Sequence, residues 1–319
     1  MRICLVTPAG ARSSYGNLAT AERWATFLRQ LGHGVMVQEV WDGERPDMMI
    51  ALHARRSCSS IARYTAAHLE RPLMGILTGT DLYRDIRFDE GAQRSLDLAT
   101  HLVVLQDAGQ AELEPRYCAK TRVIYQSTDP SPPPTKRHFD ICVVGNLRTE
   151  KDPFRAAVAA RLLPGASHIR PTHAGRAQSV EFAEEARTHM EKDARYRWIG
   201  ELPRWRVRKL LSHTRLLVQS SFMEGGANTL SEALAAGVPV IASDIPGNVG
   251  MLGEDYPGYY PVGDEKALAH ALERIEADAA FRQLLEARCA ARKHLVTPER
   301  EQGALEDLVN EAAKYSRAG

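Results

Sequence analysis

Residues 221–244, SFMEGGANTLSEALAAGVPVIASD, join two apolar runs through a helix-forming segment. The sequence predicts a buried strand at Leu216–Gln219, a helix at Thr229–Ala236 and a second strand at Pro239–Ala242. Both strand candidates are continuous apolar runs rather than alternating ones, which is typical of parallel strands covered on both faces. This stretch therefore indicates a parallel α/β sheet.

The same alternation of short apolar runs and helix-period segments continues in both directions. It predicts a helix at Phe154–Leu163 and a long helical tail from Glu265 to Tyr315. Further strands are expected at Ile3–Thr7, Val35–Val40, Met48–Leu52, Leu73–Leu77, Leu102–Leu105, Arg122–Tyr125, Ile141–Val144 and Tyr196–Ile199.

A proline-rich segment divides this pattern into two arrays. Asp129-Pro-Ser-Pro-Pro-Pro-Thr-Lys-Arg cannot continue a helix or lie inside a sheet. We expect an α/β protein of two doubly wound, Rossmann-like domains facing a central cleft. The predicted boundaries are 1–129, a linker at 130–138, and 139–298, with a C-terminal helix at about 299–319 that packs back on the first domain.

Composition excludes several classes of function. The 319 residues carry a net charge of +1, which offers no field for nucleic acid. The five cysteines stand far apart, and no Cys/His cluster suggests a metal. No leader segment precedes Ile3–Thr7 and no apolar run approaches the roughly 20 residues of a spanning helix. We expect a cytoplasmic, metal-independent protein without a membrane partner.

The turn before the 229–236 helix is a candidate diphosphate site. Gly225 and Gly226 allow close approach of the backbone to a ligand, and Asn228 is expected to cap the helix. Free N–H groups and the positive end of the helix dipole would then lie at the carboxyl edge of the sheet. The donor-binding residues predicted from this stretch are Gly225, Gly226, Ala227, Asn228 and Thr229.

Two glutamates flank this turn. A carboxylate close to a phosphate is unfavourable unless it binds something else, and Glu224 and Glu232 can both accept hydrogen bonds from hydroxyl groups. A diphosphate between two hydroxyl-bearing groups describes a nucleotide sugar. We assign Glu224 to the transferred sugar and Glu232 to the ribose; the alternative is that both are solvated surface glutamates.

A basic loop, Gly145-Asn-Leu-Arg-Thr-Glu-Lys-Asp-Pro, follows the first strand of the second array. Asp152 is expected to cap the next helix and Pro153 to begin it. A departing nucleoside diphosphate needs cationic stabilisation, and the sequence has no Asp-x-Asp pair to hold a metal. Arg148 and Lys151 are the candidates for that charge.

The Glu-x7-Glu spacing of Glu224 and Glu232, followed by Glu-Ala-Leu-Ala-Ala-Gly-Val-Pro-Val-Ile-Ala-Ser, resembles the retaining glycosyltransferases of the GT-B fold, family 4. The resemblance implies that Lys151 matches the family lysine, whereas Asn146 stands where the family has arginine and Arg148 is the candidate substitute. It further implies that the glycine turns near Gly10 and Asn17, and near Gly247 and Asn248, face the donor.

The acceptor side departs from that family. Its histidine position is Thr78, which cannot act as a general base at neutral pH. Asp81 and His53 are the remaining candidates for a base. An acceptor that is already anionic needs no base; Arg12 is among the cations that would recognise it.

A narrower resemblance rests on Gly16-Asn17 with Thr20-Ala-Glu-Arg-Trp-Ala, Thr78-Gly-Thr-Asp-Leu-Tyr, Leu147-Arg-Thr-Glu-Lys-Asp-Pro-Phe-Arg, Arg197-Trp-Ile-Gly-Glu, Glu224-Gly-Gly-Ala-Asn and Gly247-Asn-Val-Gly-Met-Leu-Gly. These motifs look like the selenosugar synthases of bacterial selenoneine biosynthesis. The resemblance implies transfer of N-acetylglucosamine or glucose from a UDP donor to selenophosphate, giving a sugar that carries selenium at its anomeric carbon and loses its phosphate.

Three alternatives stay open at this point. One is a family 4 enzyme with a hydroxyl, thiol or lipid acceptor, and another is a catalytically silent GT-B protein that binds a nucleotide sugar. The third is a nucleotide-sugar epimerase of the same architecture. The sequence also leaves open whether the anomeric configuration is retained or inverted, and the oligomeric state.

Overall fold

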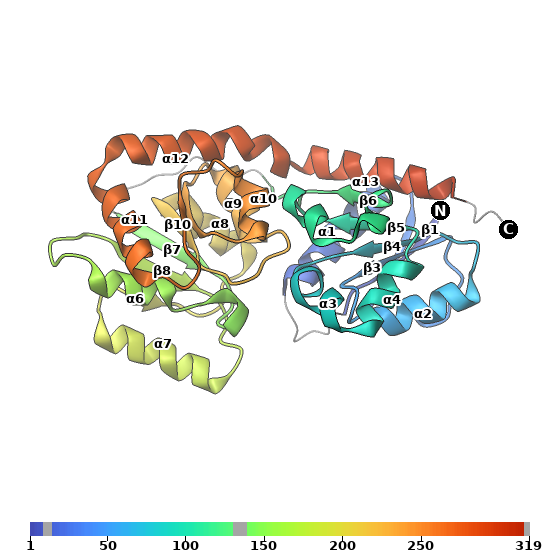
Figure 1. Ribbon diagram of the computed structural model, residues 1–319, viewed down its shortest axis with the longest axis horizontal. Coiled ribbons are helices and arrows are strands. Elements are labelled where there is room, and N and C mark those ends of the chain that lie inside the picture. The colour runs from blue at the N-terminus through green and yellow to red at the C-terminus, as the bar shows by residue number, and fades with distance from the viewer. Residues whose placement is uncertain (9–14, 130–138, 316–319) are drawn as a thin grey trace. The chain divides into compact units, whose positions relative to one another are not determined.

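The computed structural model describes residues 1–8, 15–129 and 139–315. The chain forms two compact units (Figure 1). The first comprises Met1–Gln126, Glu224–Gly226 and Pro298–Gly319, and the second comprises Ser127–Met223 and Ala227–Thr297. The predicted linker, 130–138, lies outside the described residues.

The sheet of the first unit has six strands in the order β2-β1-β3-β4-β5-β6, all paired in parallel. The chain goes from β1 to β2 on one side and then to β3 on the other, so the strand order reverses between β1 and β3. The strands are β1 (Arg2–Val6), β2 (Gly34–Gln38), β3 (Met48–Leu52), β4 (Leu73–Ile76), β5 (His101–Val104) and β6 (Thr121–Val123).

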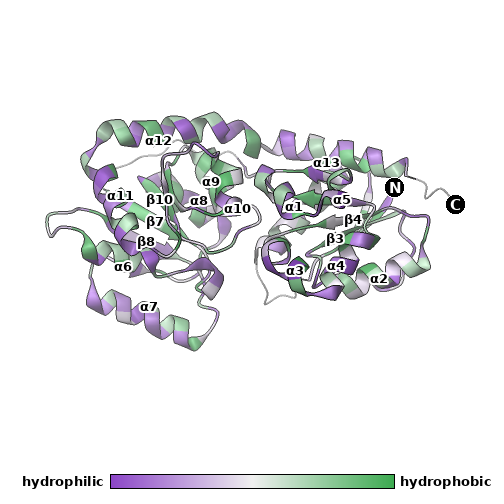
Figure 2. Ribbon diagram, in the orientation of Figure 1, coloured by the Kyte–Doolittle hydropathy of each residue, from purple (hydrophilic) through white to green (hydrophobic). Residues whose placement is uncertain are grey.

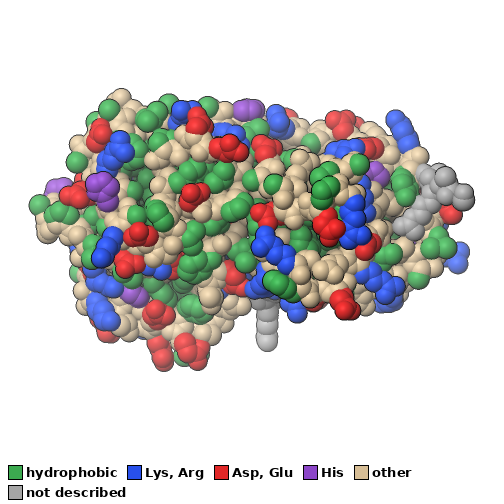
Figure 3. Space-filling view, in the orientation of Figure 1, with side chains coloured by type: hydrophobic (Ala, Val, Ile, Leu, Met, Phe, Trp, Pro, Cys, Tyr) green, Lys and Arg blue, Asp and Glu red, His purple; other side chains and the backbone are tan. Residues whose placement is uncertain are grey.

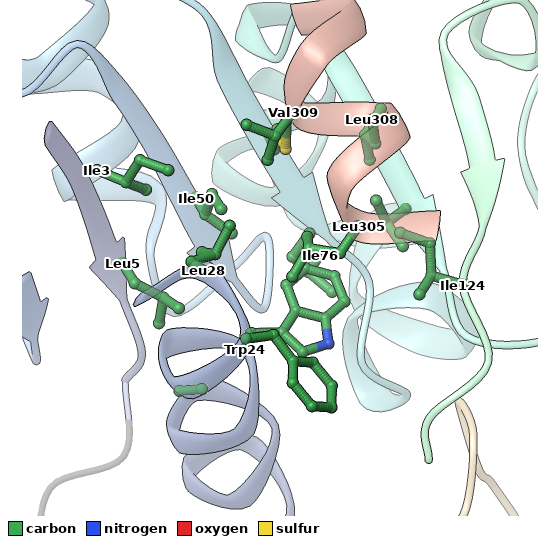
Figure 4. Packing of buried hydrophobic residues seen from close by; sticks show 14 of the residues in the cluster. Ile3, Leu5, Trp24, Leu28, Ile50, Ile76, Ile124, Leu305, Leu308 and Val309 are labelled. Atoms are coloured by element: carbon green, nitrogen blue, oxygen red, sulfur yellow. The ribbon is translucent and has the colours of Figure 1, made fainter. Parts of the chain in front are cut away.

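Helices cover both faces of this sheet. The longer ones are α1 (Tyr15–Gln30), α2 (Cys58–Ala67), α4 (Glu90–Leu98) and α13 (Pro298–Ala313); the shorter ones are α3 (Ile86–Phe88), α5 (Pro115–Cys118), the π-helical η1 (Asp81–Asp85) and the 3-10 helix η2 (Asp107–Glu112). Figure 4 shows Trp24 and Leu28 of α1 among Ile50, Ile76 and Leu305, in one buried cluster.

The C-terminal helix α13 contributes to this core. Its Glu301 is 1% exposed and accepts hydrogen bonds from Arg23 Nε at 2.7 Å and Trp24 Nε1 at 2.7 Å. A buried carboxylate is tolerated when it is paired and hydrogen-bonded in this way. The segment from Pro298 onwards therefore belongs to the first unit although it ends the chain.

The sheet of the second unit also has six parallel strands, in the order β12-β11-β10-β7-β8-β9. They are β7 (Asp140–Val144), β8 (Arg170–Ala174), β9 (Arg197–Trp198), β10 (Leu216–Gln219), β11 (Val240–Ser243) and β12 (Tyr259–Tyr260). The α-helices are α6 (Arg155–Leu162), α7 (Val180–Lys192), α8 (Arg204–His213), α9 (Asn228–Ala236), α10 (Pro246–Leu252), α11 (Glu265–Ala277) and α12 (Ala279–Arg292), with 3-10 turns η3 (Thr149–Lys151) and η4 (Lys293–Val296).

The predicted α/β class, with two doubly wound parallel sheets, is confirmed. Two strands of the second sheet, β8 and β12, were not predicted. Pro171 interrupts the apolar pattern of β8, and β12 has only two residues, so neither gives the signal of a buried strand.

Two predicted helix starts are wrong. Helix α9 begins at Asn228, and its N-cap residue is Ala227, without a side-chain hydrogen bond. Helix α6 begins at Arg155 after Phe154, and Asp152 instead ends the turn η3 in the left-handed conformation. Helix α9 thus begins one residue earlier than predicted and α6 begins later, so local capping preferences did not locate either start.

The surface is polar and mixed in charge. In Figure 2 the long outer helices, α7 and α13 among them, alternate between hydrophilic and hydrophobic residues, as expected for helices with one buried face. Figure 3 shows acidic and basic side chains interspersed over the face in view. Among the described residues, no helix is both long and apolar enough to cross a membrane.

Candidate functional site

The strand order of the second sheet reverses between β10 and β7. The chain leaves β7 through α6 to reach β8 on one side, whereas β10 pairs with β7 on the other. Ligands of open α/β sheets bind where loops diverge at the carboxyl ends of such strands. A small pocket of about 10 Å³ lies here, lined by Val143, Val144, Gly145, Lys151, Pro153, His173, Val218, Gln219, Ser220 and Ser221.

The main chain around Lys151 is fixed to the end of β10. The Ser220 hydroxyl lies 3.3 Å from the Lys151 carbonyl oxygen and donates to the Asp152 carbonyl oxygen at 2.9 Å. The Phe222 N–H donates to the Glu150 carbonyl oxygen at 2.9 Å. These bonds hold the loop after β7 against the segment after β10, so Lys151 is presented at the switch point.

Asp152 follows Lys151 in an unusual backbone conformation, with φ of 43°. A non-glycine residue in the left-handed region is strained and persists only where its surroundings enforce it. Here the Asp152 carboxylate accepts from Arg155 Nε at 2.7 Å, and Arg155 also pairs with Glu265. The turn that carries Lys151 is therefore held from two sides.

Two glycines lie beside this loop, and the second of them is sterically required. A Cβ atom on Gly145 would lie 3.7 Å from Lys151 Cδ, so the lysine stem runs across Gly145. A Cβ atom on Gly175 would lie only 1.8 Å from the Gly145 carbonyl oxygen, which no side chain could accommodate. The two turns, after β7 and after β8, thus pack backbone against backbone.

The first turn of α9 lies at the same edge. The Thr229 hydroxyl donates to the carbonyl oxygen of Val144, the last residue of β7, at 3.3 Å. Amide groups of a first helical turn have no partner within the helix, and the dipole there is positive. The end of α9 and the Lys151 loop therefore both offer positive charge at the carboxyl end of β7, which is suited to a phosphate group.

The two predicted glutamates occupy different settings. Glu232 is half-buried on α9, near β7: burial raises the pKa of Cys142 to about 12, and the charge of Glu232 adds to that rise. Glu224 is 8% exposed, and with Gly225 and Gly226 it is grouped with the first unit.

Of the other predicted donor residues, Asn17 lies in the first turn of α1 rather than in a loop, and Gly10 lies outside the described residues. Gly247 and Asn248 form part of α10 instead of a glycine turn. Asn248 is fully buried and donates to the Ser243 carbonyl oxygen at 2.9 Å, so it fastens α10 to the end of β11.

Two polar side chains of the basic loop, Arg148 and Asn146, have different contacts. Arg148 is one-quarter exposed, and its Nε lies 3.9 Å from Glu150. Asn146, at the position of the family arginine, accepts from the Arg176 N–H at 3.1 Å. Asn146 therefore braces the loop against the turn after β8.

At the carboxyl edge of the first sheet, Asp81 is completely buried and bonded to backbone. Its Oδ1 accepts from the N–H groups of Thr78 and Gly79, each at 2.9 Å, and its Oδ2 accepts from the N–H of Ala54 at 2.9 Å. These bonds occupy both oxygens and join the turns after β3 and β4. Such a carboxylate organises the backbone and is poorly placed to accept a proton from a substrate.

His53 directly follows β3, at the point where the first sheet reverses its strand order. It is 3% exposed and has a φ of 68°. Its Nε2 lies 3.0 Å from the Thr80 hydroxyl and 4.0 Å from Asp85, while Nδ1 lies 3.9 Å from Asp81. The structure thus brings His53 and Asp81 together; Arg12 lies outside the described residues.

Sequence reasoning missed two residues of the second-unit pocket, Ser220 and His173. Ser220 follows a recognised strand, but nothing local distinguishes it from any serine of a loop. His173 lies on β8, which was itself not predicted, and it is 1% exposed. Burial lowers the pKa of His173 to about 4, so its imidazole is neutral at physiological pH.

Comparison with known proteins agrees with this architecture. Residues 126–293, more than half of the chain, match the family model described as glycosyl transferases group 1. The chain therefore belongs to the group 1 glycosyl transferases, and it is a glycosyltransferase.

Solved structures show the same fold at low sequence identity. HepE from Anabaena, solved in complex with UDP-glucose, is 15% identical, with a TM-score of 0.76 over 98% of this chain and 100% of that one. Sucrose-phosphate synthase from Thermosynechococcus elongatus is 16% identical, with a TM-score of 0.78 over 97% and 98%. A glycosyltransferase from Rickettsia africae is 13% identical, with a TM-score of 0.74 over 99% of both chains. The fold is thus that of the GT-B glycosyltransferases.

Proposed function

We propose that this glycosyltransferase moves N-acetylglucosamine or glucose from a UDP-sugar to selenophosphate. The observation that carries the donor half is the convergence of the Lys151 loop and the first turn of α9 at the switch point of the second sheet. A dianionic leaving group needs positive charge that is already in place when its bond breaks. The UDP-glucose complex of HepE, which has this fold, supports a nucleotide-sugar donor.

In this proposal each predicted donor-site residue has a role. Lys151 and the α9 N-terminus stabilise UDP as it departs, with Arg148 beside them. Glu232 accepts from the ribose hydroxyls, and Glu224 accepts from hydroxyls of the transferred sugar. The loop bonds from Ser220 keep Lys151 in place before the substrate arrives, so less reorganisation is needed in the transition state.

The proposed acceptor follows from the residues that could have acted as a general base. Thr78 occupies the position of the family histidine, and both carboxylate oxygens of Asp81 accept hydrogen bonds from backbone N–H groups. Selenophosphate arrives as an anion with a soft nucleophilic atom and requires no deprotonation. Its selenium forms the new bond to the anomeric carbon while the bond to the UDP oxygen breaks, and UDP leaves with that electron pair.

Mass spectrometry of the products tests both halves. The protein is incubated with UDP-N-acetylglucosamine or UDP-glucose and selenophosphate, in buffer containing EDTA. Release of UDP together with a selenium-bearing sugar is the expected result. Parallel incubations with thiophosphate, and without acceptor, separate selectivity for selenium from general reactivity and from hydrolysis.

An unchanged donor in the presence of both selenophosphate and thiophosphate would overturn the acceptor assignment. UDP release only with a hydroxyl compound would instead indicate a conventional acceptor. His53 would then be the first residue to replace, because it lies at the switch point of the first sheet with Thr80 and Asp85 beside its Nε2.

A further inference from the structure

We propose that His173 is a positioning residue for Lys151: paired with Tyr196, its imidazole fixes the Gly145 carbonyl and so the start of the loop that carries the lysine. The inference rests on the proposed function only for the role of Lys151. His173 itself lies on β8, a strand apart from the loop, and lines the same pocket as Lys151.

The hydrogen bonds define one tautomer of His173. Its Nε2 lies 3.0 Å from the Gly145 carbonyl oxygen, and its Nδ1 lies 3.0 Å from the Tyr196 hydroxyl. A carbonyl oxygen can only accept, so Nε2 carries the hydrogen and Nδ1 accepts from the tyrosine. Tyr196 is 1% exposed, Gly145 is partly buried, and the main chain of Pro153 is a further partner of the imidazole.

The Gly145 peptide is the hinge of the Lys151 loop. Its N–H donates to the Ala174 carbonyl oxygen at 2.9 Å, which extends the pairing of β7 with β8 by one residue. Its carbonyl oxygen faces His173, and the Lys151 stem runs across its Cα. The orientation of this peptide therefore determines where the lysine stem begins to cross the pocket.

Replacement of the imidazole has a local consequence. Without the Nε2–H group the Gly145 carbonyl oxygen would lose a buried donor, and the peptide would gain by rotating toward water. The contact with Gly175 blocks small adjustments, because the two backbones already touch. The loop would then move as a segment, and misplacement of a catalytic cation by about 1 Å can cost up to about 100-fold in rate.

The experiment compares the loop and the activity in His173→Leu, His173→Gln and Tyr196→Phe. Hydrogen exchange measured by mass spectrometry reports the amides of residues 145–152. Kinetics report kcat and KM for the UDP-sugar. His189→Leu is the matched control, because it removes another buried imidazole of this unit, one that stacks on Phe154, contacts Arg161 and meets Tyr196 only edge-on, with ring centroids 6.2 Å apart.

For His173→Leu we expect exchange of the 145–152 amides to rise at least about tenfold and kcat to fall between about tenfold and 100-fold, with KM changed less than about threefold. His173→Gln should keep most of the wild-type kcat and most of the slow exchange of the 145–152 amides, because its amide nitrogen can donate to the same carbonyl. Tyr196→Phe should give a smaller change in the same direction, and His189→Leu should leave the loop amides at their original exchange rates.

Loop exchange and kcat at wild-type levels in folded His173→Leu would overturn the inference. If that variant does not fold, equal loop exchange in His173→Gln, Tyr196→Phe and His189→Leu would overturn it. A wild-type protein that neither binds UDP nor releases it would refute the proposed function, whereas the exchange comparison would still decide whether His173 holds the loop.

Discussion

At the carboxyl edge of the first sheet, where the turns after β3 and β4 meet, the buried carboxylate of Asp81 accepts three backbone N–H groups. At the switch point of the second sheet, between β10 and β7, Lys151 lies over a glycine and lines an open pocket. The first edge uses its charge to hold two turns together. The second holds its turn with hydroxyl and backbone bonds, and its lysine lines the pocket.

This difference shows that sequence position at a switch point does not by itself give a residue a chemical role. Asp81 and Lys151 both follow the carboxyl end of a strand, in loops with glycine close by. What separates them is their surroundings: Asp81 is fully buried and accepts from three backbone N–H groups and the Thr78 hydroxyl, whereas Lys151 lines the pocket. Replacing Asp81 is therefore expected to change stability before chemistry.

The largest expected effect is on catalysis at the second edge. Lys151→Met keeps the stem on Gly145 and removes the charge, so transfer should fall about 100- to 1000-fold with the unfolding temperature unchanged. Glu224→Ala should give a loss of similar size. Steady-state kinetics with circular dichroism melts check both, and a folded Lys151→Met enzyme with normal kcat would break the comparison.

The next effect concerns stability at the first edge. Asp81→Ala leaves three buried N–H groups without an acceptor and should destabilise the protein by about 4 kcal/mol. Asp81→Asn keeps one acceptor oxygen and should lose about half as much. Urea unfolding measures the change. If Asp81→Asn instead keeps full stability and loses activity, Asp81 acts in the chemistry after all.

A pH-dependent loss of stability is expected in the second unit. The pKa of His173 is lowered to about 4 by burial, below its ordinary value of 6.5. The unfolded chain therefore binds the proton more readily, so stability is complete above pH 6.5 and is lost as the pH falls toward 4, by about 3 kcal/mol.

Denaturant titrations at pH 7 and pH 4.5 measure this loss, and His173→Gln should reduce it. His189 adds to the same trend, because burial and the charge of Arg161 lower its pKa to about 4. An undiminished pH dependence in His173→Gln would assign the effect to His189 and other groups.

The smallest effect is expected for Arg148. Its side chain is one-quarter exposed and 3.9 Å from Glu150, so its charge is screened and shared. Arg148→Ala should lower kcat/KM about fivefold, close to 1 kcal/mol. A loss as large as that of Lys151→Met would mean that the two cations act as one unit at the phosphate.

Parts of the site could be read from the sequence because they depend on local order. The apolar run at Leu216–Gln219, the paired glycines and the existence of the following helix follow directly from side-chain periodicity and backbone freedom, although the helix begins one residue earlier than predicted. The role of Lys151 stays a prediction, based on its charge in this loop and on the family resemblance. The cap at Asp152 was predicted wrongly. Hydrogen bonds from Arg155 to its carboxylate and from Ser220 to its carbonyl oxygen hold that residue in a left-handed turn.

The sequence by itself determined the α/β class and the two parallel arrays, since both are carried by periodicity along the chain; the glutamate–lysine set stays a prediction. Only the tertiary structure decided which charges are committed to the fold. Asp81 meets the N–H of Ala54, and His173 meets Gly145 and Tyr196, only when separate strands pair side by side. Hydrogen bonds of this kind depend on strand order and register, which local sequence does not encode.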